Sequence, residues 1–252
     1  MIEIRNVSKS FGPLRVVNDV TLTIPAGGVT SIIGPNGAGK STLLAIMARL
    51  MLPDEGTVCV DGMDVARTDG NRLARHLAIL RQDNHISARL TVRDLVTFGR
   101  YPVNRGRPTQ QDHAEVEQAL AYLDLTSLSH RFLDELSGGQ RQRAFIAMTM
   151  CQGTNYILLD EPLNNLDVRH AVELMKLLRG AARDLSKTIV MVIHDVNFAS
   201  CYSDLVVAMR DGQVVMQGTP DKVIDKEPLS SLFGCRFDVH DIGHERIATY
   251  YV

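Results

Sequence analysis

The sequence lacks the features that mark membrane-spanning, secreted or disulfide-bonded proteins. No run of about 18 apolar residues is present, so we do not expect the chain to span a membrane. The first residues, Met1 to Arg5, alternate like a strand and lack the charged-then-apolar layout of a signal peptide. The 4 cysteines are scattered without a C-x-x-C pair, which fits a reduced cytosol better than a disulfide scaffold.

An excess of charge of one sign is also missing. The chain has 27 Lys and Arg against 29 Asp and Glu, a formal net charge of −2, so no global field recruits nucleic acid or anionic lipid. Its 45% hydrophobic and 22% charged residues are typical of a soluble globular protein. With 252 residues, the chain can bury an ample core in one large domain or two small ones.

One glycine-rich motif indicates phosphate binding. It reads Gly34-Pro35-Asn36-Gly37-Ala38-Gly39-Lys40-Ser41 and lies between the apolar run Val29–Ile33 and a segment, Thr42–Met47, spaced like a buried helix face. Backbone N–H groups of such a loop surround an anion, and the helix dipole points its positive end at the same place. Lys40 can bridge the outer phosphates, and the Ser41 hydroxyl can ligate Mg²⁺. Eight matching positions favour a nucleoside triphosphate site over a glycine turn ending by chance in Lys-Ser.

An acidic pair follows a second apolar run. Asp160 and Glu161 end the segment Tyr156–Leu159, and ligands of open α/β sheets gather at the carboxyl ends of strands. We therefore expect Asp160 to hold Mg²⁺ and Glu161 to activate a water for in-line attack on the γ-phosphate. The alternative is an acidic pair that only caps the strand, which the nearby phosphate loop disfavours.

A third motif has the residue pattern of a helix start; it reads Leu136-Ser137-Gly138-Gly139-Gln140. Ser137 and Gln140 form a capping box, but two glycines in a first helical turn each cost about 1 kcal/mol relative to alanine. Their presence suggests that something approaches the backbone closely, and a helix N-terminus with a hydroxyl suits a phosphate. The chain thus has a second phosphate-binding helix start, without a lysine.

Periodicity divides the chain into two kinds of structure. Residues 1–84 and 152–252 alternate strands with helices, including buried parallel strands at 156–159 and 189–193 with a crossover helix at 168–185. Residues 85–151 carry helix signals alone, with capping boxes starting helices at Val92–Phe98 and Asp112–Leu123. We predict a single α/β domain with an antiparallel β subdomain and an inserted all-helical subdomain.

Together, Gly34–Thr42, Leu136–Gln140 and Tyr156–Pro162 resemble the Walker A, signature and Walker B motifs of an ABC-type ATPase, a P-loop NTPase fold. The resemblance covers nearly the whole chain. It implies that two copies stack head to tail, with each ATP between the P-loop of one copy and the signature helix of the other. Ser137, Gly138, Gly139 and Gln140 would then contact the partner's nucleotide.

The resemblance also implies roles for single residues. Phe11 stands where the family places an aromatic that stacks on adenine, and Val16 would pad the base beside it. Gln82 resembles the Q-loop glutamine that reaches Mg²⁺ and the attacking water, and His194 resembles the H-loop histidine that contacts the γ-phosphate. Asp167 fits the D-loop that crosses the dimer interface. The pair Asn164-Asn165 departs from the small or hydroxylated residues commonest in that loop. Stacking and apolar contacts discriminate poorly between ATP and GTP, so the preference for ATP is inferred from the resemblance to the family.

Such an ATPase can serve one of three systems. The first is a membrane importer, the second is a membrane exporter, and the third is a soluble system that acts on ribosomes or DNA. Proteins of the third kind usually carry two cassettes or a long coiled coil, whereas this chain has one cassette. The segment Thr91–Pro102, especially Gly99-Arg100-Tyr101-Pro102, resembles importers of iron(III)-siderophores, haem and vitamin B12, and Glu161–Asp167 suits the siderophore branch.

We therefore predict the motor subunit of a siderophore importer, with haem, vitamin B12 or metal importers as alternatives. Its expected partners are a second copy, integral-membrane permease subunits and, indirectly, a substrate-binding protein, with no nucleic acid. Its expected place is the cytoplasmic face of a bacterial inner membrane, and its cofactors are ATP and Mg²⁺.

Two weaker signals have ordinary explanations. Cys235, His240 and His244 resemble part of a zinc site, but no fourth ligand is evident and we expect this segment to be a surface tail. Arginines cluster in the helical insert, where we expect a solvated face; they are Arg89, Arg93, Arg100, Arg105 and Arg107.

Overall fold

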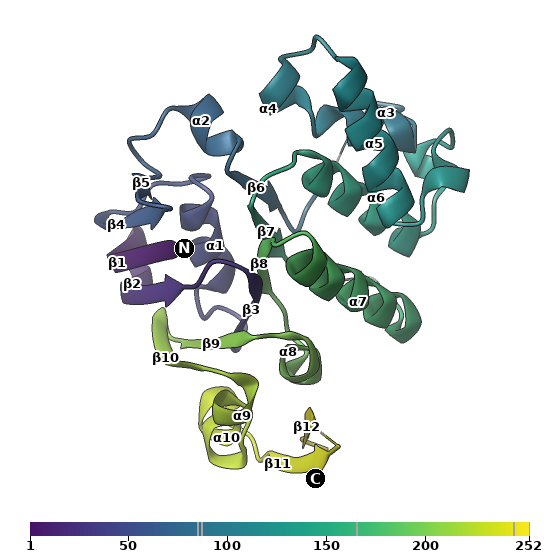
Figure 1. The fold of residues 1–252 in the computed structure, drawn as a ribbon. Coiled ribbons are helices and arrows are strands. Elements are labelled where there is room, and N and C mark those ends of the chain that lie inside the picture. The colour runs from purple at the N-terminus through teal and green to yellow at the C-terminus, as the bar shows by residue number, and fades with distance from the viewer. Residues whose placement is uncertain (85, 87, 165, 244, 252) are drawn as a thin grey trace.

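The computed structural model describes every residue except 85, 87, 165, 244 and 252. Its centre is a six-stranded sheet with the order β10-β9-β3-β8-β7-β6 (Figure 1). All neighbours in this sheet are parallel except β9 and β10. The strands are β3 (Gly28–Ile33), β6 (Leu77–Leu80), β7 (Tyr156–Asp160), β8 (Thr188–Val192), β9 (Leu205–Arg210) and β10 (Gln213–Gly218).

A four-stranded antiparallel sheet packs beside the large sheet, in the order β2-β1-β4-β5. Its strands are β1 (Ile2–Phe11), β2 (Leu14–Ile24), β4 (Glu55–Val60) and β5 (Met63–Asp64). Helix α1 (Lys40–Met47) lies between the two sheets (Figure 1) and contributes Leu43, Leu44, Ile46 and Met47 to their shared core. The buried helix face expected after the glycine loop is confirmed.

The other face of the large sheet is covered by helices. Helix α7 (Val168–Asp184) and helix α8 (Val196–Tyr202) connect the strands, and α7 contributes Leu174, Met175 and Leu178 to the core. Beyond them, the segment after β6 forms the helices gathered at one end of Figure 1. These are α3 (Val92–Phe98), α4 (Tyr101–Asn104), α5 (Gln110–Tyr122) and α6 (Gly138–Cys151), with 3₁₀ turns at Thr126–Leu128 and Leu133–Glu135.

The capping signals located the helix starts. Thr91, Thr109 and Ser137 each accept a hydrogen bond from the backbone N–H three residues later, and each capping box is complete. The middle helix begins at Gln110, two residues before the expected start, and ends at Tyr122. The predicted fold class, an α/β core with an antiparallel sheet and a helical insert, is confirmed. Its boundaries at 84/85 and 151/152 stay a prediction.

One arginine of the helical insert was interpreted wrongly. Arg100 is 7% exposed and so does not belong to a solvated face. Its Nε donates to Asp112 at 2.9 Å, and its Nη1 donates to the carbonyl oxygen of Cys151 at 2.9 Å. Arg100 therefore ties the start of α4 to α5 and to the end of α6.

The C-terminal segment was also interpreted wrongly. After α9 (Pro220–Val223) and α10 (Lys226–Phe233), residues expected to form a surface tail make the antiparallel strands β11 (Asp238–Ile242) and β12 (Glu245–Thr249). Asn197 of α8 fixes β12 by exchanging two hydrogen bonds with the backbone of Ala248. His244, named above as a zinc ligand, lies outside the described residues. A short helix, α2 (Gly70–Ala74), was missed.

None of the helices that the structure describes is both long enough and apolar enough to cross a membrane.

Candidate active site

The glycine loop joins the end of β3 to the start of α1, as expected. Gly34 has φ 145°, and a Cβ at this position would collide with the carbonyl oxygen of Met209. Gly39 has φ 90° and caps α1, and a Cβ there would collide with the carbonyl oxygen of Val16. These two glycines are therefore required by close backbone contacts and by left-handed backbone conformations.

Lys40 is folded into the loop that precedes it. It is 5% exposed, and its ammonium donates to the carbonyl oxygens of Gly34 at 2.8 Å and Pro35 at 2.9 Å. Burial lowers the pKa of Lys40, although the nearby carboxylates of Glu161 and Asp160 oppose the shift. A partly desolvated cation beside a ring of backbone N–H groups attracts an anion strongly.

Ser41 and Asp160 meet at the carboxyl end of β7. The Ser41 hydroxyl donates to Oδ1 of Asp160 at 2.8 Å, and burial raises the pKa of the Asp160 carboxyl. A hydroxyl and one carboxylate fit Mg²⁺, because this ion keeps several waters and takes other ligands from substrate phosphates. Within the described chain, no group of three or more His, Cys, Asp or Glu side chains forms a metal site by itself.

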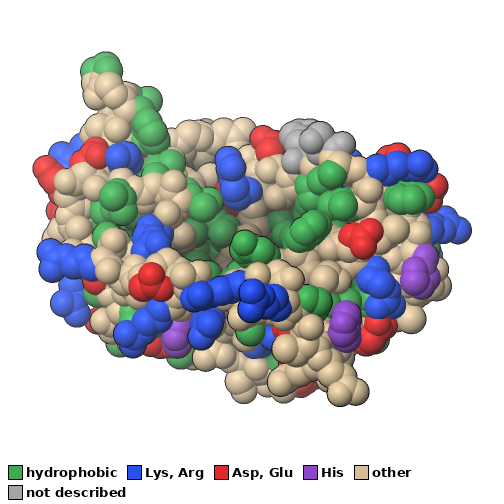
Figure 2. All heavy atoms as spheres, turned by 90° about the horizontal axis from the view of Figure 1, so that it is seen from above, with side chains coloured by type: hydrophobic (Ala, Val, Ile, Leu, Met, Phe, Trp, Pro, Cys, Tyr) green, Lys and Arg blue, Asp and Glu red, His purple; other side chains and the backbone are tan. Residues whose placement is uncertain are grey.

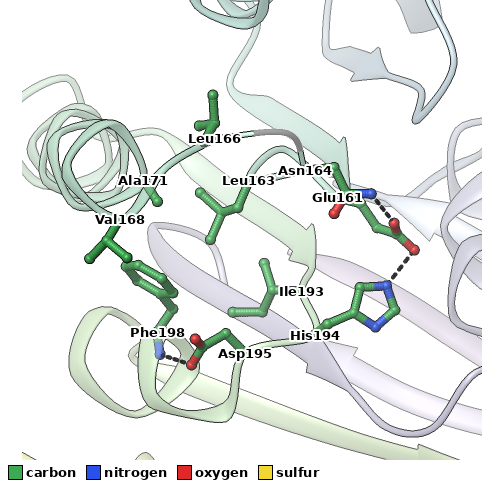
Figure 3. A pocket seen from close by; sticks show the side chains of 10 residues that line it. All are labelled: Glu161, Leu163, Asn164, Leu166, Val168, Ala171, Ile193, His194, Asp195 and Phe198. Carbon is green, nitrogen blue, oxygen red and sulfur yellow. Dashed lines mark hydrogen bonds and ion pairs between the residues drawn. The ribbon is translucent and has the colours of Figure 1, made fainter. Parts of the chain in front are cut away.

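Glu161 is the centre of a hydrogen-bonded cluster drawn in part in Figure 3. Gln82 Nε2 donates to its Oε2 at 2.7 Å, and His194 Nε2 lies 2.7 Å from its Oε1. Asn164 donates from its amide to Oε2 as well. The three residues expected to act on the attacking water and the γ-phosphate are thus brought together, although they come from loops after β6, β7 and β8.

Three cavities surround these residues. One of about 170 Å³ is lined by Val16, the loop Asn36–Thr42, Glu161 and His194. A second of about 260 Å³ is lined by Ser41, Gln82 and Asp160 with apolar residues such as Leu50. The third, also about 260 Å³, lies on the far side of Glu161 and His194 and is lined by Leu163, Leu166 and Phe198 (Figure 3).

The residues expected to hold the base lie at the tip of the small sheet. Phe11 ends β1 with half of its surface exposed, and Val16 lies in the following strand and borders the cavity beside the glycine loop. An exposed aromatic ring offers a stacking face for a base. Their contact with adenine stays a prediction.

The signature residues do not reach the glycine loop of the same chain. Among the described residues, neither of the two cavities that border Ser41 is lined by Ser137, Gly138, Gly139 or Gln140. Instead, a Cβ on Gly139 would lie 3.3 Å from Leu166 and 3.5 Å from the ring of His170. The helix start is therefore shaped by packing against Leu166 and the first turn of α7. Among the described residues, the Ser137 hydroxyl bonds only to the backbone N–H of Gln140, as the helix cap.

Asp167 caps helix α7 from an exposed position. Its carboxylate accepts from the backbone N–H of His170 at 2.9 Å, and this bond lowers the pKa of Asp167. An exposed cap at the edge of the site is compatible with the expected interface role, which stays a prediction. Asn165 lies outside the described residues.

Two side chains of the site were missed. Gln142, on α6, donates to the carbonyl oxygen of Pro162 at 3.0 Å and so joins the signature helix to the segment that carries Glu161. From the sequence, Asn164 was noted only because it differs from the usual residues of the D-loop. Its position three residues after Glu161, with Pro162 between them, is typical of a turn and could have predicted the contact.

A family model for the ABC transporter matches residues 17–164. This chain belongs to the ABC transporter family. It is an ABC-type ATPase subunit, as the motifs indicated. The Petrobactin import ATP-binding protein YclP of Bacillus subtilis (strain 168) is 49% identical over 251 residues, covering 100% of both chains. The Petrobactin import ATP-binding protein FatE of Bacillus anthracis is 49% identical over 250 residues, covering 99% of this chain and 100% of that protein.

A solved ABC structure has the same fold. The ATP-binding cassette MJ0796, a dimer bound to ADP and Pi in a post-hydrolysis state, superposes with a TM-score of 0.77 and 28% identity. The superposition covers 87% of this chain and 99% of MJ0796. The signature and P-loop motifs therefore belong to a cassette fold that is also found as a dimer.

Proposed function

We propose that this ABC ATPase drives the import of an iron(III)-siderophore through a membrane permease. The observation that carries the proposal is 49% identity, along the whole chain, to two ATP-binding proteins named for petrobactin import. We place the subunit on the cytoplasmic face of a bacterial inner membrane, bound peripherally to permease subunits and served by a substrate-binding protein.

The proposed reaction begins with triphosphate binding at Gly34–Thr42. The Lys40 ammonium exchanges two carbonyl oxygens for the outer phosphates, which offset the cost of burying its charge. The N–H groups at the start of α1 add their dipoles. Phe11 and Val16 hold the base.

The proposed metal site consists of Ser41, Gln82 and Asp160. Mg²⁺ bound there supplies positive charge that stabilises the charge developing on the transferred phosphoryl group. The buried carboxylate of Asp160, whose pKa is raised by burial, gains a cationic partner when the site fills.

The proposed general base is Glu161. It takes a proton from water while His194 turns from Glu161 to the γ-phosphate and stabilises the charge there. Gln82 lies in the loop between the core and the helices, so its contacts can couple nucleotide binding to movement of those helices.

We propose a head-to-tail dimer in which Ser137 and Gly139 of the partner close over the γ-phosphate. The support is that the described signature residues do not border the cavities beside Ser41 of their own chain. Asp167 then lies at the interface. Closure makes hydrolysis depend on the second copy.

A Ser137→Arg variant tests this arrangement. We expect ATP binding to each subunit to persist and ATP-dependent dimerisation to weaken at least tenfold, because a long cation replaces a small hydroxyl at the closing surface. Light scattering with and without ATP measures the dimer, and a fluorescent ATP analogue measures binding. Ser127→Arg, at an exposed position of the 3₁₀ turn Thr126–Leu128, is the control for added charge. Unchanged dimerisation in Ser137→Arg contradicts the proposal.

The permease docking surface is proposed at the end of the molecule where α2 and α4 lie. Figure 2 looks down on this end and shows hydrophobic side chains gathered along a hollow, with basic side chains around it. Exposed apolar residues occur after α1 and in α3–α4; they are Leu50, Leu52, Phe98, Tyr101 and Val103. Exposed apolar side chains along a hollow suit the docking of a helix of another subunit.

The transport proposal is tested in cells that carry the chain with its own permease. Uptake of ⁵⁵Fe bound to petrobactin is expected to require the chain, and tagged chain solubilised from membranes is expected to carry the permease with it. Parallel assays with haem and vitamin B12 separate the alternatives. Uptake of those cargoes but not of the siderophore overturns the proposed cargo, whereas recovery with ribosomes overturns the membrane function.

A further inference from the structure

Asn164 folds back over Glu161 within a single turn. Glu161 has φ 51°, a left-handed conformation that is uncommon for a residue with a side chain. The backbone N–H of Asn164 donates to the carbonyl oxygen of Glu161 at 3.2 Å, and Pro162 occupies the second position of this turn, where its fixed φ is favourable. The Asn164 amide is thereby brought onto the carboxylate three residues before it.

The donors are distributed unequally over the two carboxylate oxygens. Oε2 accepts from both Asn164 and Gln82, whereas Oε1 contacts only His194 among the described residues. The Glu161 side chain is 11% exposed, so few waters compete for these bonds. Since each carboxylate oxygen has two lone pairs, two amide donors fill Oε2.

The three donors differ in what they can do when ATP arrives. Gln82 and His194 lie in loops after β6 and β8 and can turn toward the nucleotide without moving the turn. Asn164 belongs to the turn itself, and two hydrogen bonds hold this turn. The backbone N–H of Glu161 donates to the carbonyl oxygen of Val192 at 3.1 Å, and the Gln142 side chain donates to the carbonyl oxygen of Pro162. The Asn164 amide can therefore keep its bond to Glu161 while the other two donors turn toward the nucleotide.

We propose that Asn164 is a positioning residue that holds Oε2 of Glu161 and leaves Oε1 to take the proton from the attacking water. The inference rests on the proposed role of Glu161 as general base. In the reaction, the water O–H bond breaks and its proton goes to Oε1. The water oxygen bonds to the γ-phosphorus, and the bond from that phosphorus to the bridging oxygen breaks, leaving its electrons on ADP. A carboxylate with one oxygen fixed presents the other in a defined direction.

The test compares Asn164→Ala and Asn164→Asp with the wild-type dimer. Loss of a hydrogen bond to a charged group is expected to lower kcat about 10- to 100-fold in Asn164→Ala. KM for ATP is expected to stay unchanged, because Asn164 makes no contact with the glycine loop among the described hydrogen bonds. Since Asn164 lies in the loop expected at the dimer interface, kcat is compared at protein concentrations at which the ATP-bound dimer is saturated. Asn164→Asp, which has the same shape but repels Glu161, is expected to lower kcat further.

Asn155→Ala is the matched control, because Asn155 is an exposed asparagine at the other end of β7. In a Glu161→Gln background, Asn164→Ala is expected to leave the residual rate unchanged, since no base remains to be positioned. Wild-type kcat in either Asn164 variant overturns the inference, as does a parallel loss of kcat, ATP binding and dimerisation, which indicates a structural role. Wild-type kcat in Glu161→Gln alone overturns the proposed base instead.

Discussion

ATP turnover by a Glu161→Gln variant is expected to fall about 10²- to 10⁴-fold, while ATP binding and ATP-dependent dimerisation stay at wild-type levels. Glutamine keeps the length and shape of the side chain and can still accept amide hydrogen bonds from Gln82 and Asn164. It cannot take a proton from water. Because Lys40, Ser41 and Asp160 are untouched, the binding half of the reaction is preserved.

The measurement is phosphate release in single-turnover and steady-state assays, with size-exclusion chromatography in ATP to follow the dimer. The variant is expected to accumulate as a closed dimer, because hydrolysis is the step that lets it reopen. Glu227→Gln, an exposed position on α10, controls for the loss of one negative charge. Hydrolysis at the wild-type rate by Glu161→Gln would remove this residue from the role of base.

The parts of the site that the sequence predicted are those encoded within a few neighbouring residues. The glycine loop, the capping box at Ser137 and the strand ending in Asp160 each have a local physical cause, namely backbone conformation, cap hydrogen bonds and an apolar run. Local causes of this kind survive in the folded chain because the tertiary structure does not oppose them.

The parts that were missed depend on contacts between distant segments. Gln142 reaches Pro162 only because α6 packs against the loop after β7, and no pattern within α6 indicates that contact. The hairpin β11–β12 has few buried side chains, so its strands lack the apolar alternation that marks a strand in a sequence. It is instead held to α8 by side-chain to backbone bonds.

The burial of Arg100 also depends on contacts between distant segments and was not predicted from the sequence. It leads to the second prediction of a large effect, a loss of stability. Its side chain and that of Asp112 are 9% and 5% exposed, and they are joined at 2.9 Å. A buried pair was not expected from an arginine-rich segment, because burial depends on how α4, α5 and α6 meet. Replacing one partner leaves the other charge buried without compensation, which typically costs about 3–5 kcal/mol.

An Arg100→Met variant is therefore expected to lose about 3–5 kcal/mol in free energy of unfolding, or roughly 6–20 °C in Tm for a chain of this size. Urea denaturation and calorimetry measure the two quantities. Arg107→Met, at an exposed position of the same segment, is the matched control and is expected to change stability by less than about 0.5 kcal/mol. Nucleotide-site residues are not altered, so any surviving folded protein is expected to bind ATP.

The second partner gives the decisive comparison. Asp112→Asn alone is expected to destabilise the chain, because Arg100 loses its counter-ion, although the amide oxygen can still accept from Thr109. In the Arg100→Met background the same substitution is expected to stabilise the chain, because a neutral amide costs less to bury than a carboxylate. A change in the sign of the Asp112→Asn effect on stability between the two backgrounds is specific to a buried ion pair. Losses of stability that simply add in the double variant would contradict the presence of such a pair.

The pair also gives stability a defined pH dependence. Hydrogen bonds from Thr109 and the Arg100 side chain hold the pKa of Asp112 well below its usual range. A carboxyl group with a lowered pKa in the folded state stabilises that state fully above its unfolded pKa of about 4, and this contribution is lost as the pH falls through the folded value. The difference in unfolding free energy between wild type and Asp112→Asn is thus expected to be constant from pH 8 to 5 and to shrink below about pH 4. A difference that instead grows on acidification would show that the Asp112 carboxylate is not the stabilising form.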